Sequence, residues 1–303
     1  MAGQVIRTGG AVAVTPLATA GEAPRRGRGV WGRFRRHRLA LVGMVLLGLL
    51  TVAAVAAPVI TQSPFRTELR SLKKPPSAEH LLGTDAAGRD VFARLVHAGR
   101  VSLSVGLVAV AIYTTIGLVL GAVAGYFGGA ADAVLMRLAD VFLAFPSLVV
   151  IITLVSILGP DIRNVMLAIG LLGWPPIARL VRGQFLSLRE RDFVTAGRTV
   201  GATNGRLIFR HLLPNALAPV IVAATFGMAQ AILLEAGLSF LGLGVQPPTP
   251  SWGNMLTDAQ SLTVLESQPW LWVPPGCMIA LAVLAINFIG DGLRDALDPR
   301  ATR

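Results

Sequence analysis

A polar, arginine-rich segment interrupts an otherwise apolar chain: Asp192-Phe-Val-Thr-Ala-Gly-Arg-Thr-Val-Gly-Ala-Thr-Asn-Gly-Arg-Leu-Ile-Phe-Arg-His-Leu-Leu-Pro214. Its pattern predicts two short helices broken at Gly201, and Pro214 marks the start of the next long helix, where a missing backbone donor costs little. Apolar side chains such as Phe193 and Ile208 alternate with the arginines. We therefore predict either a loop that inserts into a groove on another protein or an amphipathic helix at the membrane interface.

The composition around this segment is that of a membrane protein. Of 303 residues, 53% are hydrophobic and only 14% are charged, which excludes an ordinary soluble domain. A net charge of +11 would suggest nucleic acid as a partner of a soluble protein. Here the arginines cluster beside long apolar runs, where they act as topology signals, so no nucleic-acid partner is predicted. The single cysteine, Cys277, excludes an intramolecular disulfide.

Six apolar runs are candidates for membrane spans, judged by the roughly 20 residues that a helix needs to cross a bilayer. The predicted spans are residues 39–60, 101–127, 133–158, 164–180, 212–241 and 270–290. The fourth is short and broken by Pro175-Pro176. Because such a break is tolerated only where protein or a water-filled cavity satisfies the freed carbonyls, the fourth span should lie inside a helical bundle.

These spans divide the chain into segments. The predicted segments are a disordered basic tail (1–30), a first transmembrane helix (31–60), an extracytoplasmic segment (61–98), a five-helix core (99–295) with the polar loop 182–214, and a C-terminal tail (296–303). In the extracytoplasmic segment, the apolar positions Val91, Leu95 and Val96 predict a short amphipathic helix. The distribution of Lys and Arg places both termini and the polar loop in the cytoplasm of a multi-pass cell-membrane protein.

Particular residues of the polar loop carry a family resemblance. Ala196 is followed by Gly201 five residues on, then by Ile208 and by Leu213-Pro214. This pattern resembles the EAA loop of permease subunits of ATP-binding cassette importers. The family's Glu-Ala-Ala is Thr195-Ala-Gly197 here, so the contacts of that glutamate do not transfer to this chain.

Further motifs resemble one branch of that family, the C-type permeases of dipeptide, oligopeptide and nickel importers. They are His80-Leu-Leu-Gly-Thr-Asp85, Gly88-Arg-Asp-Val-Phe92, Arg100-Val-Ser-Leu-Ser104, Glu235-Ala-Gly-Leu-Ser-Phe-Leu-Gly-Leu-Gly244 and Pro247-Pro-Thr-Pro-Ser-Trp-Gly253. The resemblance extends over about residues 30–300. Several long motifs in the same order make a chance similarity improbable.

The resemblance implies an all-α membrane protein with six transmembrane helices, in the type I importer (MetI-like) permease fold with cytoplasmic coupling helices. It also implies a homologous second permease, an external substrate-binding protein, a peptide substrate, and two ATP-binding cassette domains that carry ATP and Mg. This chain itself would bind no cofactor and catalyse no reaction. The residues implied to couple it to the ATPases are Phe193, Ala196, Gly197, Arg198, Gly201, Ala202, Arg206, Ile208, Leu213 and Pro214.

Alternative functions remain open from the residues themselves. Nickel or another small solute could replace peptide as the substrate. Asp140 and Glu235 lie within predicted spans, and intramembrane carboxylates are typical of proton-coupled secondary transporters. We expect instead that Asp140 lies near Arg137 at the inner end and that Glu235 lies near the outer end, in interfacial or paired positions. No His or Cys cluster with metal-ligand spacing and no phosphate-binding motif supports an enzyme.

Overall fold

The structure is a computed structural model that describes residues 30–298. Within that range it contains helices and no strands. The predicted tail 1–30 lies outside the described residues except for Val30, as does the predicted C-terminal tail beyond Asp298. The longer helices are α2 (Arg38–Ile60), α3 (Val91–Phe127), α4 (Gly129–Ala144), α5 (Ser147–Leu158), α6 (Ile162–Leu172), α7 (Trp174–Leu188), α10 (Leu213–Phe240) and α13 (Val273–Leu297).

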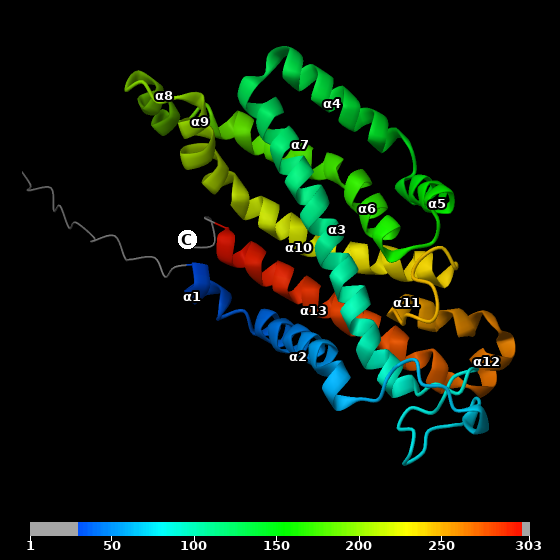
Figure 1. Cartoon of the computed structure of the whole chain (residues 1–303). Helices are drawn as coiled ribbons and strands as arrows, with labels where there is room; N and C mark the ends of the chain where they lie inside the picture. The colour runs from blue at the N-terminus through cyan, green and yellow to red at the C-terminus, as the bar shows by residue number, and fades with distance from the viewer. Residues whose placement is uncertain (1–29, 299–303) are drawn as a thin grey trace, which may run out of the picture.

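Shorter helices connect them. They are α1 (Val30–Phe34), η1 (Leu69–Ser71), α8 (Asp192–Thr199), α9 (Asn204–Arg206), η2 (Leu207–Leu212), α11 (Trp252–Met255), η3 (Leu256–Gln260), α12 (Leu262–Ser267) and η4 (Pro269–Leu271). Figure 1 shows α8 and α9 at one end of the bundle and α12 with the loop before α3 at the other end. The described ends of the chain, α1 and the end of α13, lie toward the α8 end.

Five stretches of the described chain are long and apolar enough to cross a membrane, and a sixth crosses it if a bent pair of helices is counted as one span. The five are Arg38–Ile60, Val91–Phe127, Ile162–Leu188, Asn204–Phe240 and Pro269–Leu297. The sixth is α4 with α5, which are bent by 83°. The predicted all-helical fold with six spans is thus confirmed.

Two spans differ from their predicted form: the second begins earlier than predicted, and the third is broken in its middle. The amphipathic helix predicted within 61–98 is not separate, because α3 begins at Val91 and runs without a break to Phe127. The Asp90 side chain caps α3 by accepting a hydrogen bond from the Ala93 amide at 2.7 Å. The predicted third span is broken at Phe145-Pro146, since proline disfavours the helical conformation of the residue before it and cannot donate to the helix ladder.

The first and fourth spans also differ in detail. The predicted helix 31–60 is divided into α1 and α2, and the His37 side chain caps α2 at the Ala40 amide. The fourth span continues to Leu188, well beyond residue 180, so Arg182 lies in α7 and not in the polar loop. The break expected from the two prolines falls at Gly173, because prolines are tolerated in the first turn of a helix such as α7.

Glycines allow the central helices to approach closely. On α3, a Cβ atom at Gly121 would lie 2.4 Å from the Ala178 carbonyl oxygen, and one at Gly125 would lie 2.6 Å from Cβ of Phe185. Such small residues at four-residue spacing are typical of packing between membrane helices. The core formed by α3 and α7 supports the polar loop at one end and a cavity farther along the bundle.

Candidate functional site

The polar loop forms two helical pieces with a bend at Gly201. Helix α8 ends at Thr199, and Gly201 has φ +77°, a left-handed conformation that glycine adopts without strain. The Ala202 amide donates to the Gly197 carbonyl at 3.0 Å and closes the turn. After α9 the chain continues as the π-helix η2 into α10. The break at Gly201 is therefore present, and the loop is continuous with a membrane-spanning helix.

The inner side of this loop is attached to the bundle. Val194 on α8 and Leu207 on η2 are both fully buried in the core. The Tyr126 hydroxyl, near the end of α3, donates to Asn204 Oδ1 at 2.7 Å. A Cβ at Gly197 would lie 3.0 Å from a methyl group of Leu207, so α8 packs directly on η2. The two pieces consequently form one unit joined to α3 and α10.

The outer side of the loop exposes large apolar groups among arginines. Val200 is 84% exposed, Phe209 71% and Phe193 40%. The exposed arginines are Arg198, Arg206 and Arg210. We call these six residues the docking surface. Apolar side chains that protrude among charges are typical of protein interfaces.

The predicted coupling residues all lie between α8 and the start of α10, at the end of the bundle where Figure 1 labels α8 and α9. These residues fall into an exposed group and a partly buried group. The exposed ones are Phe193, Ala196, Arg198, Gly201, Arg206 and Pro214, and the partly buried ones are Gly197, Ala202, Ile208 and Leu213. Ile208 packs against the core and offers little to a partner. The next residue, Phe209, is not among the predicted coupling residues but is the exposed aromatic group of this segment.

Both intramembrane carboxylates have partners. Asp140 on α4 accepts from Arg179 on α7 at 2.6 Å, so its ion pair is with Arg179 and not with the neighbouring Arg137. Glu235 is fully buried and accepts hydrogen bonds from Ser102 and Ser239. These contacts bridge α4 to α7 and α10 to α3, which is a packing role.

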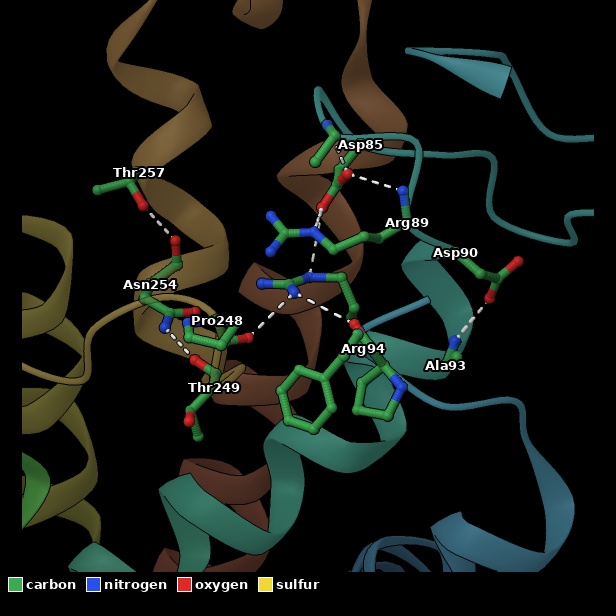
Figure 2. A network of polar contacts seen from close by, with 12 residues as sticks. Asp85, Arg89, Asp90, Ala93, Arg94, Pro248, Thr249, Asn254 and Thr257 are labelled. Carbon is green, nitrogen blue, oxygen red and sulfur yellow. Dashed lines mark hydrogen bonds and ion pairs between the residues drawn. The ribbon is translucent and has the colours of Figure 1, made fainter. Parts of the chain in front are cut away.

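At the opposite end of the bundle, an ionic network joins the segment before α3 to the segment after α10 (Figure 2). Asp85 Oδ2 lies 2.7 Å from Arg89 Nε and 3.4 Å from Arg94 Nε. The buried Arg94 also donates to the Pro248 carbonyl at 3.4 Å. Asp258 lines the same small pocket, and its burial, together with the negative charge of Asp85, raises its pKa. The network fastens the segment before α3 to the segment after α10.

Among the described residues 30–298, no group of three His, Cys, Asp or Glu side chains is arranged to hold a metal ion.

The fold defines a multi-pass helical membrane protein with an exposed loop of apolar and basic side chains at one end. Residues 117–303 match the family described as the binding-protein-dependent transport system inner membrane component. Residues 26–76 match the N-terminal transmembrane domain of oligopeptide transport permease C. The chain therefore belongs to the family of binding-protein-dependent transport system inner membrane components, as its sequence motifs predict.

Similar proteins extend over most of the chain. A dipeptide transport system permease protein of Alkalihalophilus pseudofirmus is 45% identical over 274 residues, which cover 90% of both chains. The oligopeptide transport system permease protein of Bacillus subtilis is 40% identical and covers 88% of both. Among solved structures, the MetNI methionine ABC transporter in an inward-facing conformation has a chain of the same fold, with a TM-score of 0.54 and 20% identity, covering 68% of this chain and 96% of that one.

Proposed function

We propose that this chain is a permease subunit of an ATP-driven importer of peptides. It would line half of the pathway beside a homologous second permease, receive peptide from an external binding protein, and transmit the work of two partner ATPase domains that hold ATP and Mg. Membership of the family supports the transport role. The names of the relatives at 45% and 40% identity support peptide as the substrate over nickel or another small solute.

The docking surface is the single observation that carries this proposal. Phe209 and Val200 are large, exposed and rimmed by arginines, which suits a groove on an ATPase domain. Behind them, Val194 and Leu207 are buried, so a force on the surface would reach α3 and α10 through rigid packing. Closure of two ATPase domains would then move the helices as a unit between two states of the pathway.

We infer that the docking surface and both termini are cytoplasmic. The surface lies at the end of the bundle to which the described ends of the chain also point (Figure 1). It carries Arg198, Arg206 and Arg210, while the basic run Arg33-Phe-Arg-Arg-His-Arg38 precedes the first span. An excess of Lys and Arg marks the cytoplasmic side of membrane proteins. The ATPases, which hydrolyse ATP in the cytoplasm, would meet the loop there.

The test replaces Gly201 by valine. A β-branched residue is strained at φ +77°, so the bend should shift while the buried side of the loop keeps its packing. In the complete complex in proteoliposomes, we expect ATP hydrolysis to continue and peptide uptake to fall at least about tenfold, which corresponds to roughly 1.4 kcal/mol of lost coupling. Gly205→Val is the matched control, because a Cβ at Gly205 meets open space and φ is ordinary there.

A second variant, Phe209→Ser, tests docking itself. Since this side chain is 71% exposed, its loss should leave the permease folded but reduce the ATPase that co-purifies with it. Unchanged uptake in Gly201→Val together with unchanged ATPase binding in Phe209→Ser would contradict the coupling assignment. A wild-type complex that imports no peptide would contradict the proposed substrate.

A further inference from the structure

A cavity of about 340 Å³ opens among six helices, α3, α4, α5, α6, α7 and α10. Its volume is at the lower end of the range of small-molecule sites, roughly 300–1,000 Å³. Most of its wall is apolar, and the polar groups that line it include the side chains of Tyr113, Ser147 and Gln230. No charged side chain lines it. The cavity therefore suits an uncharged group that makes a few hydrogen bonds.

The helix breaks of the membrane region meet at this cavity. Ser147 is the first residue of α5, directly after the 83° bend, and Gly173 separates α6 from α7. Both line the cavity. Pro175 and Pro176 have no N–H, so the carbonyls four residues earlier lack their usual helical donors. Interrupted membrane helices are tolerated where they line a cavity, and in transporters such helices form substrate sites.

Tyr113 brings a hydrogen-bonding group to the cavity wall. This side chain is only 7% exposed, and among the described residues its hydroxyl has no hydrogen-bond partner. Its ring lies over Gly227, where a Cβ would come within 1.6 Å of the hydroxyl oxygen. Both residues line the cavity. The hydroxyl is therefore available at the cavity wall to form a hydrogen bond with a group from outside the chain.

We propose that this cavity binds an uncharged part of the transported peptide: one apolar side chain with its adjoining peptide group. The inference rests on the proposed function. The Gln230 amide both donates and accepts, which matches a peptide group, and the Tyr113 hydroxyl can donate to a peptide carbonyl. The apolar wall takes the side chain. Since no charge lines the cavity, the peptide's termini are not held there.

The first test compares two dipeptides, dialanine and alanyl-phenylalanine, in uptake by the complete complex with its binding protein. Gln230→Leu removes the amide from an exposed position and should lower uptake of both peptides about two- to tenfold, the effect of one lost hydrogen bond. Gly227→Ala displaces the Tyr113 ring toward the cavity and should reduce uptake of the phenylalanine peptide more than that of dialanine. Gly237→Ala, on the same helix but facing open space, should change neither.

Two results distinguish a failure of the proposed subsite from a failure of the proposed function. If Gln230→Leu and Gly227→Ala keep wild-type rates and the wild-type ratio between the peptides, the cavity is not a subsite, although the proposed function stands. If the wild-type complex imports neither peptide but is active with another solute, the proposed function fails and the inference fails with it. Should Gly227→Ala not assemble, Tyr113→Phe with Gln230→Leu decides the question, because both keep the packing volume.

A second test measures occupancy directly. Cys277 is the only cysteine of the chain, so Cys277→Ser provides a cysteine-free background. In that background, Ser147→Cys places a thiol at the cavity, and Leu148→Cys, exposed on the adjacent residue but outside the cavity lining, is the control. During ATP-driven turnover, alanyl-phenylalanine should slow alkylation of the first thiol several-fold and leave the second unchanged. Equal alkylation rates with and without peptide at both positions would overturn the proposal.

Discussion

Replacing Glu235 tests whether this buried carboxylate holds together the end of the bundle that lies opposite α8. Its Oε1 accepts from Ser239 Oγ at 2.7 Å and its Oε2 from Ser102 Oγ at 3.0 Å. Each serine oxygen also accepts a backbone amide of the outer segment, from Val245 at 3.1 Å and from Trp252 at 3.2 Å. The carboxylate thus connects α10 and α3 to the segment that follows α10.

The size of the effect follows from these contacts. Glu235→Ala removes two hydrogen bonds, leaves two buried hydroxyls without an acceptor and opens a cavity. A bond between membrane helices is worth about 0.6 kcal/mol, and each unsatisfied buried group costs about 1–3 kcal/mol. We expect a loss of about 3–5 kcal/mol of stability, within the range of large-to-small core substitutions. Glu235→Gln keeps the volume and one acceptor oxygen, so it should cost only about 1 kcal/mol.

The assay is the thermal midpoint of the purified complex, followed by peptide uptake well below that midpoint. Glu235→Ala should lower the midpoint much more than Glu235→Gln, and the glutamine variant should retain uptake. Glu266→Gln, on the exposed surface of α12, is the control. If Glu235→Gln kept the midpoint but abolished uptake, the carboxylate would act in transport itself, as a proton-coupled mechanism requires, and the packing role would be refuted.

Two further carboxylates give predictions at the ends of the bundle. Burial and Asp85 raise the pKa of Asp258, so the charged form is disfavoured in the folded protein. Asp258→Asn should therefore raise the thermal midpoint at pH 8, and the gain should vanish as the pH falls through the raised pKa, where protonation removes the same penalty. A gain that does not change as the pH is lowered from 8, or one that is also seen for the exposed Glu79→Gln, would contradict this reasoning. Asp132 on α4 accepts a hydrogen bond from Arg182 on α7 at 2.6 Å in a partly exposed position. Asp132→Asn should therefore lower the stability of the protein by about 1 kcal/mol. Purely additive losses in a double-mutant cycle with Arg182→Gln would show that the pair contributes nothing to stability.

The sequence predicted most of the architecture, because span length and the bend at Gly201 depend on local properties. Apolar runs of sufficient length specify membrane helices, and a glycine between two short helical patterns favours a break. The structure adds a cap that was not predicted: the Thr203 side chain accepts from the Arg206 amide at the start of α9. The bend at Pro146 was missed because the surrounding run is uniformly apolar, and a mid-span proline does not reveal whether the two halves stay aligned.

The exposed face of the loop could not be predicted, for a different reason. The segment Leu207–Leu212 is a π-helix, in which the Leu213 amide bonds the Ile208 carbonyl five residues earlier. This register turns Ile208 toward the core and Phe209 toward solvent, whereas an α-helical pattern gives no reason to prefer Phe209. The cavity could not be predicted either, because its wall combines six helices, of which α10 is distant in the sequence from the others.

The position of α10 links the two proposals. This helix begins at the docking surface, passes Pro219, forms a wall of the cavity at Gly227 and Gln230, and is fastened near its end by Glu235. Its two ends are therefore held unequally: the outer end by a buried hydrogen-bond network, and the loop end by packing on a short π-helix beside an internal proline, a common site of helix bending. Under the proposed function, a displacement at the docking surface would tilt the cavity wall about the fixed outer end, so ATP-driven motion would change the peptide subsite directly.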